Sequence, residues 1–248
     1  LDSVTLAHLN QFKRDARLKV LTCAGPFSSS AIYNFGRQHA EGAVIGFIDS
    51  DLRIVSSDWL REMASHALRP EVGAVGALIF DENDSIQRAG IILGVRGGVG
   101  HAFKGFPTDS EGYVFRAQVI QNYSAVSGDC LVMRKDVFDE IGGFDEETFP
   151  STFNDVDLCL RIRRRGCRLL WTPYAKLNRR TLSIVGLAAK DKAEHERVVR
   201  NFQSRWSEVL AADPYYNLNL GLESEDFSLA SPPRARKPWK DPAEHHGP

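Results

Sequence analysis

Short apolar runs separated by polar, glycine-rich breaks are the dominant pattern of the first 135 residues. Two runs are apolar along their whole length, AVIGFI (residues 43–48) and VGAVGALIF (residues 72–80). Strands covered on both faces carry such uninterrupted runs, which are typical of sheets with helices on either side. The pattern therefore predicts an α/β fold with a mixed, mostly parallel sheet flanked by helices.

Further strands and helices are predicted from the hydrophobic period, the helix-capping residues and the glycine or proline breaks. Further strands are predicted over residues 18–23, 86–93, 123–133 and 168–171, the last ending before Pro173. Helices are predicted over residues 31–40, 59–69, 135–141, 154–165 and 187–210. The last of these helices is amphipathic, so we expect its apolar side to pack against the sheet. Docking of this helix on a membrane surface is the alternative.

Two segments lack a clear period. Residues 94–116 are rich in glycine and aromatic residues, which favours a long functional loop. The C-terminal stretch SPPRARKPWKDPAEHHGP is Pro-rich and polar, as in extended tails. We therefore predict one domain over residues 1–230 and a tail over residues 231–248.

Composition narrows the class of protein. The formal net charge is −1, so the molecule as a whole has no attraction to nucleic acid or anionic lipid. No run approaches the roughly 18 apolar residues of a membrane span. The four cysteines are scattered without a C-x-x-C pair, which argues against a zinc site; two disulfides are conceivable, but reduced thiols of a cytoplasmic protein are the expectation.

Asp49 and Asp51, in GFIDSD, follow an apolar strand directly. Ligands of open α/β sheets bind at the carboxyl ends of strands, and two neighbouring carboxylates repel each other unless a cation lies between them. Mg²⁺ or Mn²⁺ holding a diphosphate would satisfy this pair. The alternative is a turn followed by a helix cap, because D-x-D is a common tripeptide.

A second acidic pair, Asp155 and Asp157, opens the helix predicted over residues 154–165. Acids in a first helical turn can simply complement the helix dipole. An acid held there could also act as a general base on a hydroxyl group. His101, in the glycine-rich loop, could touch a substrate, but exposure to solvent is the expectation. Arginines 161, 164, 165 and 168 are interpreted as a solvated helix face.

Several segments together resemble the family 2 glycosyltransferases, in particular bacterial enzymes that build O-antigen, capsule or other cell-surface polysaccharide. The resemblance rests on an ordered set spread over nearly the whole chain. Its members are GPFSSSAIYNFGRQHAEG, GFIDSDLRIVSSDWLREM, VGAVGALIFDENDSIQRAGIILG, SAVSGDCLVMRKDVFDEIGGFDE, FNDVDLCLRIRRRG and DPYYNLNLGLESEDFSLASPPRARKPW.

The resemblance implies the GT-A fold and an inverting transfer of a sugar from a nucleotide-diphosphate donor. Asp49 and Asp51 match the D-x-D element that binds the metal and the donor diphosphate. Asp155 matches the base that takes a proton from the acceptor hydroxyl. The resemblance also assigns substrate-side roles, with Asp157 orienting the helix or the acceptor and Gly128, Asp129 and Cys130 on the acceptor-side wall. The acceptor would be a glycan or a lipid-linked saccharide at the inner face of the cell membrane.

The sequence departs from the family pattern at two places. In LNRRTLSIVG, Arg179 stands where the family has a His near the metal and diphosphate, and Thr181 stands where it has a Glu. IQRAG likewise carries Arg88 where His is common. An arginine cannot ligate a metal, but it can pair with diphosphate charge. A non-catalytic sugar-nucleotide or glycan-binding module is therefore the alternative function.

The resemblance begins after the family's first two strands, which bear an early Asp that contacts the nucleoside. We expect that Leu1 is a truncation point in a longer protein and that the domain is N-terminally incomplete.

Overall fold

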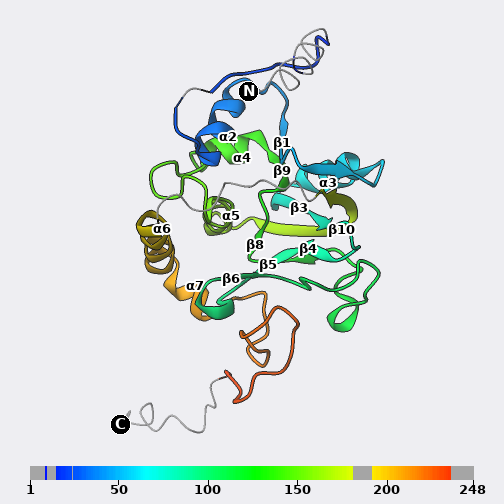
Figure 1. The fold of residues 1–248 in the computed structure, drawn as a ribbon, viewed down its shortest axis with the longest axis vertical. Coiled ribbons are helices and arrows are strands. Elements are labelled where there is room, and N and C mark those ends of the chain that lie inside the picture. Colours follow the sequence, from blue (N-terminus) through cyan, green and yellow to red (C-terminus); the bar gives the residue numbers. More distant parts are fainter. Residues whose placement is uncertain (1–8, 10–14, 24, 181–191, 236–248) are drawn as a thin grey trace.

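The computed structural model describes residues 9, 15–23, 25–180 and 192–235, and element labels follow Figure 1. A central sheet has helices on both faces. Helix α3 packs on one face, where it forms a core with strands β3 and β10. Helices α4 and α5 contribute to the larger core on the other face, with α6 outside them (Figure 1). The α/β architecture predicted from the apolar runs is confirmed.

The main sheet has seven strands in the order β1-β9-β3-β10-β2, with β4 paired to β3 and β7 to β10. It is mixed, as predicted, but the expectation of mostly parallel pairing is wrong. Among the described pairs of this sheet only β3 and β10 run parallel. Burial on both faces produces an apolar run whatever the direction of the neighbouring strand, so the pattern could not show direction. The strands are β1 (Val44–Ile48), β2 (Leu52–Ile54), β3 (Val72–Phe80), β4 (Ile86–Arg88), β7 (Gln121–Asn122), β9 (Cys130–Arg134) and β10 (Arg168–Arg179).

A second, three-stranded sheet has the order β6-β5-β8. Its strands are β5 (Gly90–Leu93), β6 (Val99–His101) and β8 (Ala125–Val126). Each of the runs 86–93 and 123–133, predicted as one strand, is divided between the two sheets. The break in the second run falls at residues 127–129, which are part of the site described below.

The helices are α2 (Ser29–Gln38), α3 (Trp59–Ala67), α4 (Lys135–Glu140), α5 (Asn154–Arg164), α6 (Lys192–Arg205) and α7 (Ser207–Ala211), with 3₁₀ turns at Val95–Gly97 and Tyr113–Phe115. Ser28 caps α2 by accepting the Ala31 N–H, as the serine run predicts. The helix predicted over 187–210 is two helices with a break at Trp206, and residues 187–191 lie outside the described part.

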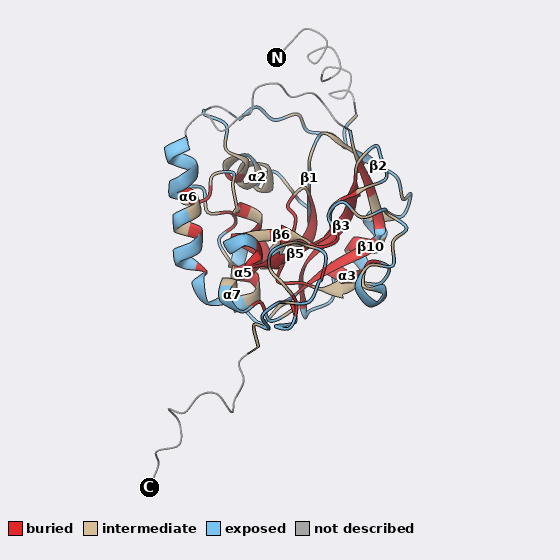
Figure 2. Ribbon diagram, turned by 60° about the horizontal axis from the view of Figure 1, so that its bottom comes forward, coloured by how far each residue is buried: buried red, intermediate tan, exposed pale blue. Residues whose placement is uncertain are grey.

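Burial divides the strands into central and edge ones (Figure 2). Every residue of β3 is buried, as its sequence predicts. In β1 only Ile45 and Phe47 are buried, because β1 is the last strand of the sheet on its side among the described residues. Residues 18–23 were predicted as a strand, but the described residues there form none. Pro173 does not end β10, although the pairing with β3 shifts register between Trp171 and Lys176.

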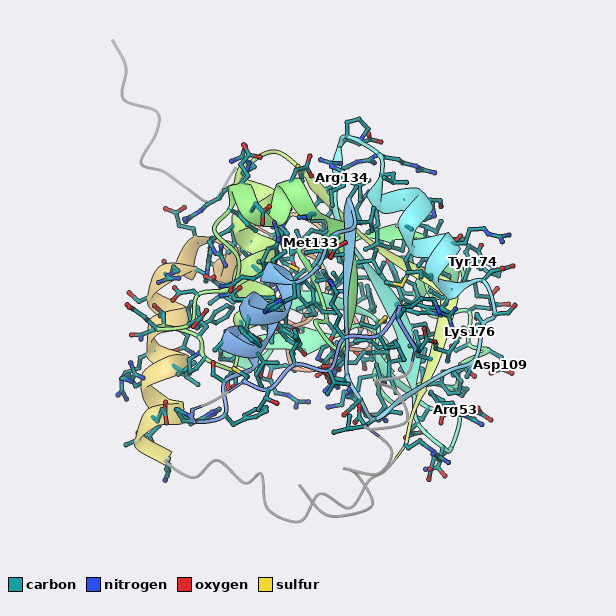
Figure 3. The ribbon with its side chains drawn as sticks, turned by 90° about the horizontal axis from the view of Figure 1, so that it is seen from above. Arg53, Asp109, Met133, Arg134, Tyr174 and Lys176 are labelled. Atoms are coloured by element: carbon teal, nitrogen blue, oxygen red, sulfur yellow. The ribbon has the colours of Figure 1, made fainter. Side chains whose placement is uncertain are left out.

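Successive side chains of β9 point to opposite faces of the sheet, as Met133 and Arg134 show (Figure 3). Met133 is fully buried in the larger core. The next residue, Arg134, reaches the end of α3, where its guanidinium donates to the Arg69 carbonyl at 2.7 Å. This contact closes the carbonyl end of α3 with a positive charge, which is favourable there.

The cysteines are free thiols in the structure, as expected: Cys130 and Cys159 are buried, Cys167 is half-buried and Cys23 is exposed. Among the described residues, no helix has the length and apolar character needed to cross a bilayer. Residues 236–248, most of the predicted tail, lie outside the described part.

Candidate active site

The Asp49–Asp51 segment lies where the sequence places it, directly after β1. It joins β1 to β2, which stand at opposite ends of the strand order. The backbone N–H of Asp49 donates to the Asp129 carbonyl at 2.9 Å, which continues the antiparallel pairing of β1 with β9. Asp49 and Asp129 are therefore neighbours because their strands are.

Arg179 is the last residue of β10, and its guanidinium contacts three carboxylates. Its Nη2 lies 3.2 Å from Asp49 Oδ2, its Nε 3.0 Å from Asp51 Oδ2 and its Nη1 3.0 Å from Asp129 Oδ2. The Nε contact is an ion pair without hydrogen-bond alignment, and the buried Asp51 Oδ1 has no hydrogen-bond partner. The arginine thus lies at the centre of a cluster that the sequence divides among three distant segments.

A second arginine completes this cluster. Arg88, the last residue of β4, donates from Nε to Asp129 Oδ2 at 2.8 Å, the same oxygen that Arg179 contacts. We call Asp49, Asp51, Asp129, Arg88 and Arg179 the Asp–Arg cluster. Three carboxylates and two guanidinium groups give it a formal charge of −1.

The charges of the cluster shift one another's pKa. Burial tends to raise the pKa of Asp129, but Arg88 and Arg179 outweigh it and hold that pKa below its ordinary value. Burial and the charge of Asp129 raise the pKa of Asp49, and the hydrogen bond from Tyr33 only partly offsets them. Tyr33, on α2, donates its hydroxyl to Asp49 Oδ1 at 2.9 Å.

Asp155 stands in the first turn of α5 beside this cluster. Its Oδ2 accepts the Gly128 N–H and its Oδ1 accepts the Val156 N–H, both at 2.8 Å. Burial first, and the charge of Asp129 second, raise the pKa of Asp155 to about 6, against the opposing effect of the Gly128 hydrogen bond and of Arg88. A carboxylate with a pKa in this range is well matched to general-base chemistry near neutral pH.

Gly128 is needed for that contact. A Cβ added to Gly128 would lie 2.9 Å from the Asp155 Cβ, closer than such atoms approach in proteins. The glycine lies between Val126, the end of β8, and Asp129, which belongs to the Asp–Arg cluster. It therefore fixes the position of the candidate base relative to the cluster.

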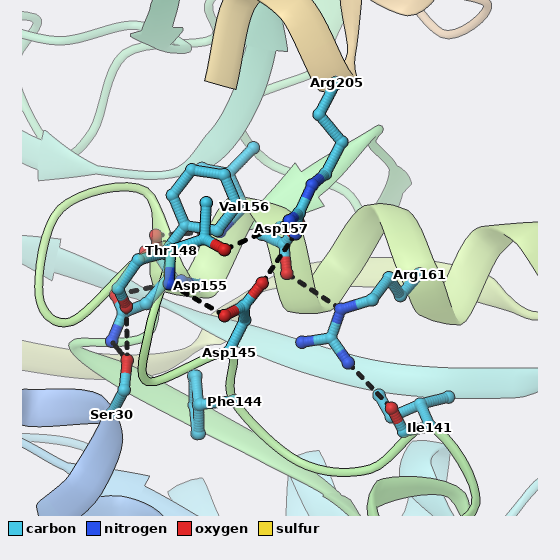
Figure 4. Close-up of polar contacts among 12 residues, drawn as sticks. Ser30, Ile141, Phe144, Asp145, Thr148, Asp155, Val156, Asp157, Arg161 and Arg205 are labelled. Carbon is cyan, nitrogen blue, oxygen red and sulfur yellow. Dashed lines mark hydrogen bonds and ion pairs between the residues drawn. The ribbon is translucent and has the colours of Figure 1, made fainter. Parts of the chain in front are cut away.

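Asp157 is held by protein partners in this structure, so of its two predicted roles, orienting the helix or the acceptor, the contacts favour the helix (Figure 4). Its side chain is fully buried. One oxygen accepts from Arg161 Nε at 2.8 Å, and the other accepts from Arg205 Nη1 and Trp206 Nε1, both at 3.1 Å. Asp157 thereby ties α5 to the junction of α6 and α7, and we interpret it as an anchor that orients the helix bearing Asp155.

Sequence reasoning gave no role to Tyr33, and it expected His101 to be exposed to solvent although it could touch a substrate. Tyr33 has no local signal, since only the fold brings α2 against the end of β1. His101, expected at the surface, is half-buried in β6; burial and the charge of Arg88 lower its pKa to about 3, so its ring is neutral. Its Nδ1 has no hydrogen-bond partner among the described residues. Arg88 was noted only as a departure from the family pattern.

The fit of a divalent cation depends on Arg179. Carboxylate oxygens such as those of Asp49 and Asp51 are suitable ligands for Mg²⁺ or Mn²⁺. In the structure, however, an oxygen of each is in contact with the Arg179 guanidinium. No group of three or more His, Cys, Asp or Glu side chains in the described part of the chain is arranged to hold a metal ion. With Arg179 in this position the residues do not fit a divalent cation.

Comparisons with known proteins agree on the family. Residues 5–185 match the family model described as Glycosyltransferase like family 2. Protein y4gI of Sinorhizobium fredii is 38% identical over 220 residues, which are 88% of this chain and 24% of that protein. The O-antigen biosynthesis protein RfbC of Myxococcus xanthus is 33% identical over 230 residues, which are 92% of this chain and 18% of that protein. The chain thus spans less than a quarter of the length of either relative.

A shorter sequence match and two solved structures are also similar to this chain, the structures in their fold. An N-acetylglucosaminyl-diphospho-decaprenol L-rhamnosyltransferase of Mycobacterium tuberculosis is 30% identical over 134 residues, 51% of this chain and 42% of that protein. GalNAc-T7, solved with UDP, GalNAc and Mn²⁺, superposes with a TM-score of 0.60 at 15% identity, covering 85% of this chain and 41% of that one. The mannosyltransferase PcManGT of Pyrobaculum calidifontis, solved with GDP-Man and Mn²⁺, gives 0.50 at 13% identity, covering 74% and 46%. The fold is therefore of the glycosyltransferase GT-A type.

Proposed function

The chain belongs to glycosyltransferase-like family 2, and we propose that it transfers a sugar from a nucleoside-diphosphate donor to a hydroxyl of a glycan or lipid-linked saccharide, with inversion, in cell-surface polysaccharide synthesis. The observation that carries the proposal is the position of Asp155, a carboxylate with a raised pKa held by Gly128 next to the Asp–Arg cluster. The names of RfbC and of the decaprenol-linked rhamnosyltransferase support the acceptor class.

Asp155 is the proposed catalytic base. It takes the proton of the acceptor hydroxyl while the acceptor oxygen attacks the anomeric carbon of the donor. The bond from that carbon to the diphosphate oxygen breaks in the same step, and the nucleoside diphosphate leaves with the electron pair. Attack opposite the leaving group inverts the anomeric configuration. The backbone N–H of Gly128 holds the carboxylate in place during the transfer.

The Asp–Arg cluster is the proposed donor end of the site. Arg179 and Arg88 supply fixed positive charge for the departing diphosphate, since guanidinium groups bind phosphate oxygens with well-defined geometry. Asp129 keeps both arginines in position, and Asp49 and Asp51 fix Arg179 from the other side. The mechanism has no step through the Mg²⁺ or Mn²⁺ predicted for Asp49 and Asp51, because the residues do not fit that cation with Arg179 between them.

The setting of this reaction is part of the proposal. We place the glycosyltransferase domain at residues 1–230 and its action at the cytoplasmic side of the membrane, where it would meet lipid-linked acceptors as a peripheral protein. The buried residues of the C-terminal segment, including Tyr216, Leu220 and Phe227, join the larger core and support a domain that extends past α7.

The test separates an enzyme from a binding module. The chain would be titrated calorimetrically with UDP, dTDP and GDP, and nucleotide release from the matching sugar nucleotides would be followed with a panel of saccharide acceptors. Asp155→Asn should abolish release while leaving nucleotide affinity within about twofold. Nucleotide binding without release in the wild-type protein would favour the degenerate binding module. The absence of any nucleotide binding would refute both functions.

A further inference from the structure

Arg179 is held over the carboxylates by the backbone. Its residue pairs with Leu52 at the end of the β10–β2 ladder, and the next N–H, that of Arg180, donates to the Asp51 carbonyl at 3.1 Å. Main-chain pairing of residues 179 and 180 with residues 52 and 51 thus fixes Arg179 beside the Asp49–Asp51 segment. The position of the guanidinium therefore follows from the strand pairing, and its side chain is mostly buried.

The charge of the cluster decides which cation it can take. With both arginines the formal charge is −1. Without Arg179, three carboxylates and Arg88 would leave −2, which a divalent cation would neutralise. The Arg179 guanidinium already lies 3.0–3.2 Å from the three carboxylates. A divalent cation bound to the same carboxylates would lie close to the guanidinium, and the two positive charges would repel each other.

Arg179 also keeps hydrogen-bonding capacity toward a ligand. A guanidinium has five N–H donors. Its hydrogen bonds to Asp129 and Asp49 use one N–H on each terminal nitrogen, and the Nε contact with Asp51 is an ion pair. The second N–H on each terminal nitrogen remains for a phosphate oxygen, as far as the described residues show. Arg88, which contacts the same Asp129 oxygen, provides a second positive charge next to Arg179.

From this arrangement we propose that Arg179 is the resident cation of the donor site, so that the chain binds the nucleoside diphosphate through Arg179 and Arg88 without a divalent metal. The inference rests on the proposed function and concerns how the same site holds its donor. It departs from the two structural neighbours, both of which were solved with Mn²⁺.

The first experiment measures nucleotide binding with and without metal. UDP, dTDP and GDP are titrated into the wild-type chain in EDTA and again in Mn²⁺. We expect the affinity of the preferred nucleotide to be the same in both within about threefold. In EDTA, Arg179→Ala should weaken it by at least about tenfold, the loss expected for a charge-assisted hydrogen bond to phosphate. Arg168→Ala is the matched control, because Arg168 pairs with Glu71 at the surface away from the cluster.

The second experiment needs no nucleotide. Binding of Mn²⁺ alone is followed by electron paramagnetic resonance. The wild-type chain should leave Mn²⁺ free, whereas Arg179→His, which removes the fixed charge and adds a possible ligand, should bind it. Circular dichroism confirms that each variant is folded, and Arg179→Lys, which keeps the charge, should leave Mn²⁺ free as well.

The outcomes distinguish this inference from the proposed function. Nucleotide binding in EDTA that is lost in Arg179→Ala supports both. Wild-type binding that requires Mn²⁺, or tight binding of Mn²⁺ alone by the wild-type chain, overturns the role of Arg179 and leaves the glycosyltransferase proposal standing. No nucleotide binding in either buffer overturns the proposed function itself.

Discussion

Replacing Gly128 by alanine tests the contact that positions the candidate base. The new Cβ would lie 2.9 Å from the Asp155 Cβ, whereas ordinary contacts begin at 3.4 Å, so one of the two must move by about 0.5 Å. Asp155 cannot retreat easily, because its neighbours Asn154 and Val156 are buried in α5. Overpacking of this kind costs about 1–3 kcal/mol in the free energy of unfolding. For a chain of this length that corresponds to a loss of about 2–12 °C in Tm.

The assay is thermal unfolding followed by far-ultraviolet circular dichroism, with Gly36→Ala as the matched control. Gly36 lies within α2 and has no atom within 4 Å of an added Cβ, so the same substitution should stabilise the protein there by about 0.5–1 kcal/mol. Gly128→Ala should also weaken the hydrogen bond that lowers the pKa of Asp155, and so move the acid limb of the rate profile to higher pH. A Tm equal to or above that of the wild-type protein, with an unchanged pH profile, would refute the close contact.

Three further predictions concern separate parts of the molecule. Because the pKa of Asp155 is raised to about 6 and the base works only when deprotonated, kcat/KM should fall tenfold per pH unit below about pH 6 and level off above it, as pH-resolved nucleotide release would show. Asp157→Ala should lower the free energy of unfolding by about 3 kcal/mol in urea titrations, because the buried Trp206 indole and Arg161 Nε lose their acceptor, and yet it should keep nucleotide affinity. A loss of affinity in the folded variant would return Asp157 to the substrate side. Cys23 is exposed and should react with a thiol reagent in the native protein. Cys130 should react only on unfolding, because it is buried and its burial raises the pKa of its thiol to about 12; rapid labelling of Cys130 in the native protein would contradict this.

The elements that sequence reasoning predicted best are those decided by local pattern. Strand β3 has the predicted bounds because it is buried on both faces along its whole length. The serine-capped helix α2 begins within two residues of its prediction, because a cap is a local hydrogen bond. The position of Asp49 after a strand follows from the same local reading.

Long-range contacts account for the differences between the predicted and the observed elements. The run 123–133 is apolar enough for one strand, yet it divides at Gly128, which turns toward an acid 27 residues away. The helix predicted over 187–210 breaks at Trp206, whose indole is bonded to Asp157 on another helix. Strand directions, and the approach of Arg88 and Tyr33 to the acids, depend on which strands become neighbours, and no local period encodes that choice.

The wide spacing of the Asp–Arg cluster along the chain has a consequence for biosynthesis. Arg179 contacts Asp49 across 130 residues and Asp129 across 50, and the strands that carry them meet only when the main sheet is assembled. Non-local pairings of this kind form late and slowly during folding. On the ribosome, Asp49 and Asp51 are therefore made well before Arg179, and they remain without this counter-charge until β10 emerges and pairs with β3. Asp129 differs, because its other partner, Arg88, is made before it. Among the described residues, β10 is the last strand of the sheet to be synthesised, and it brings the second of the two arginines to the cluster.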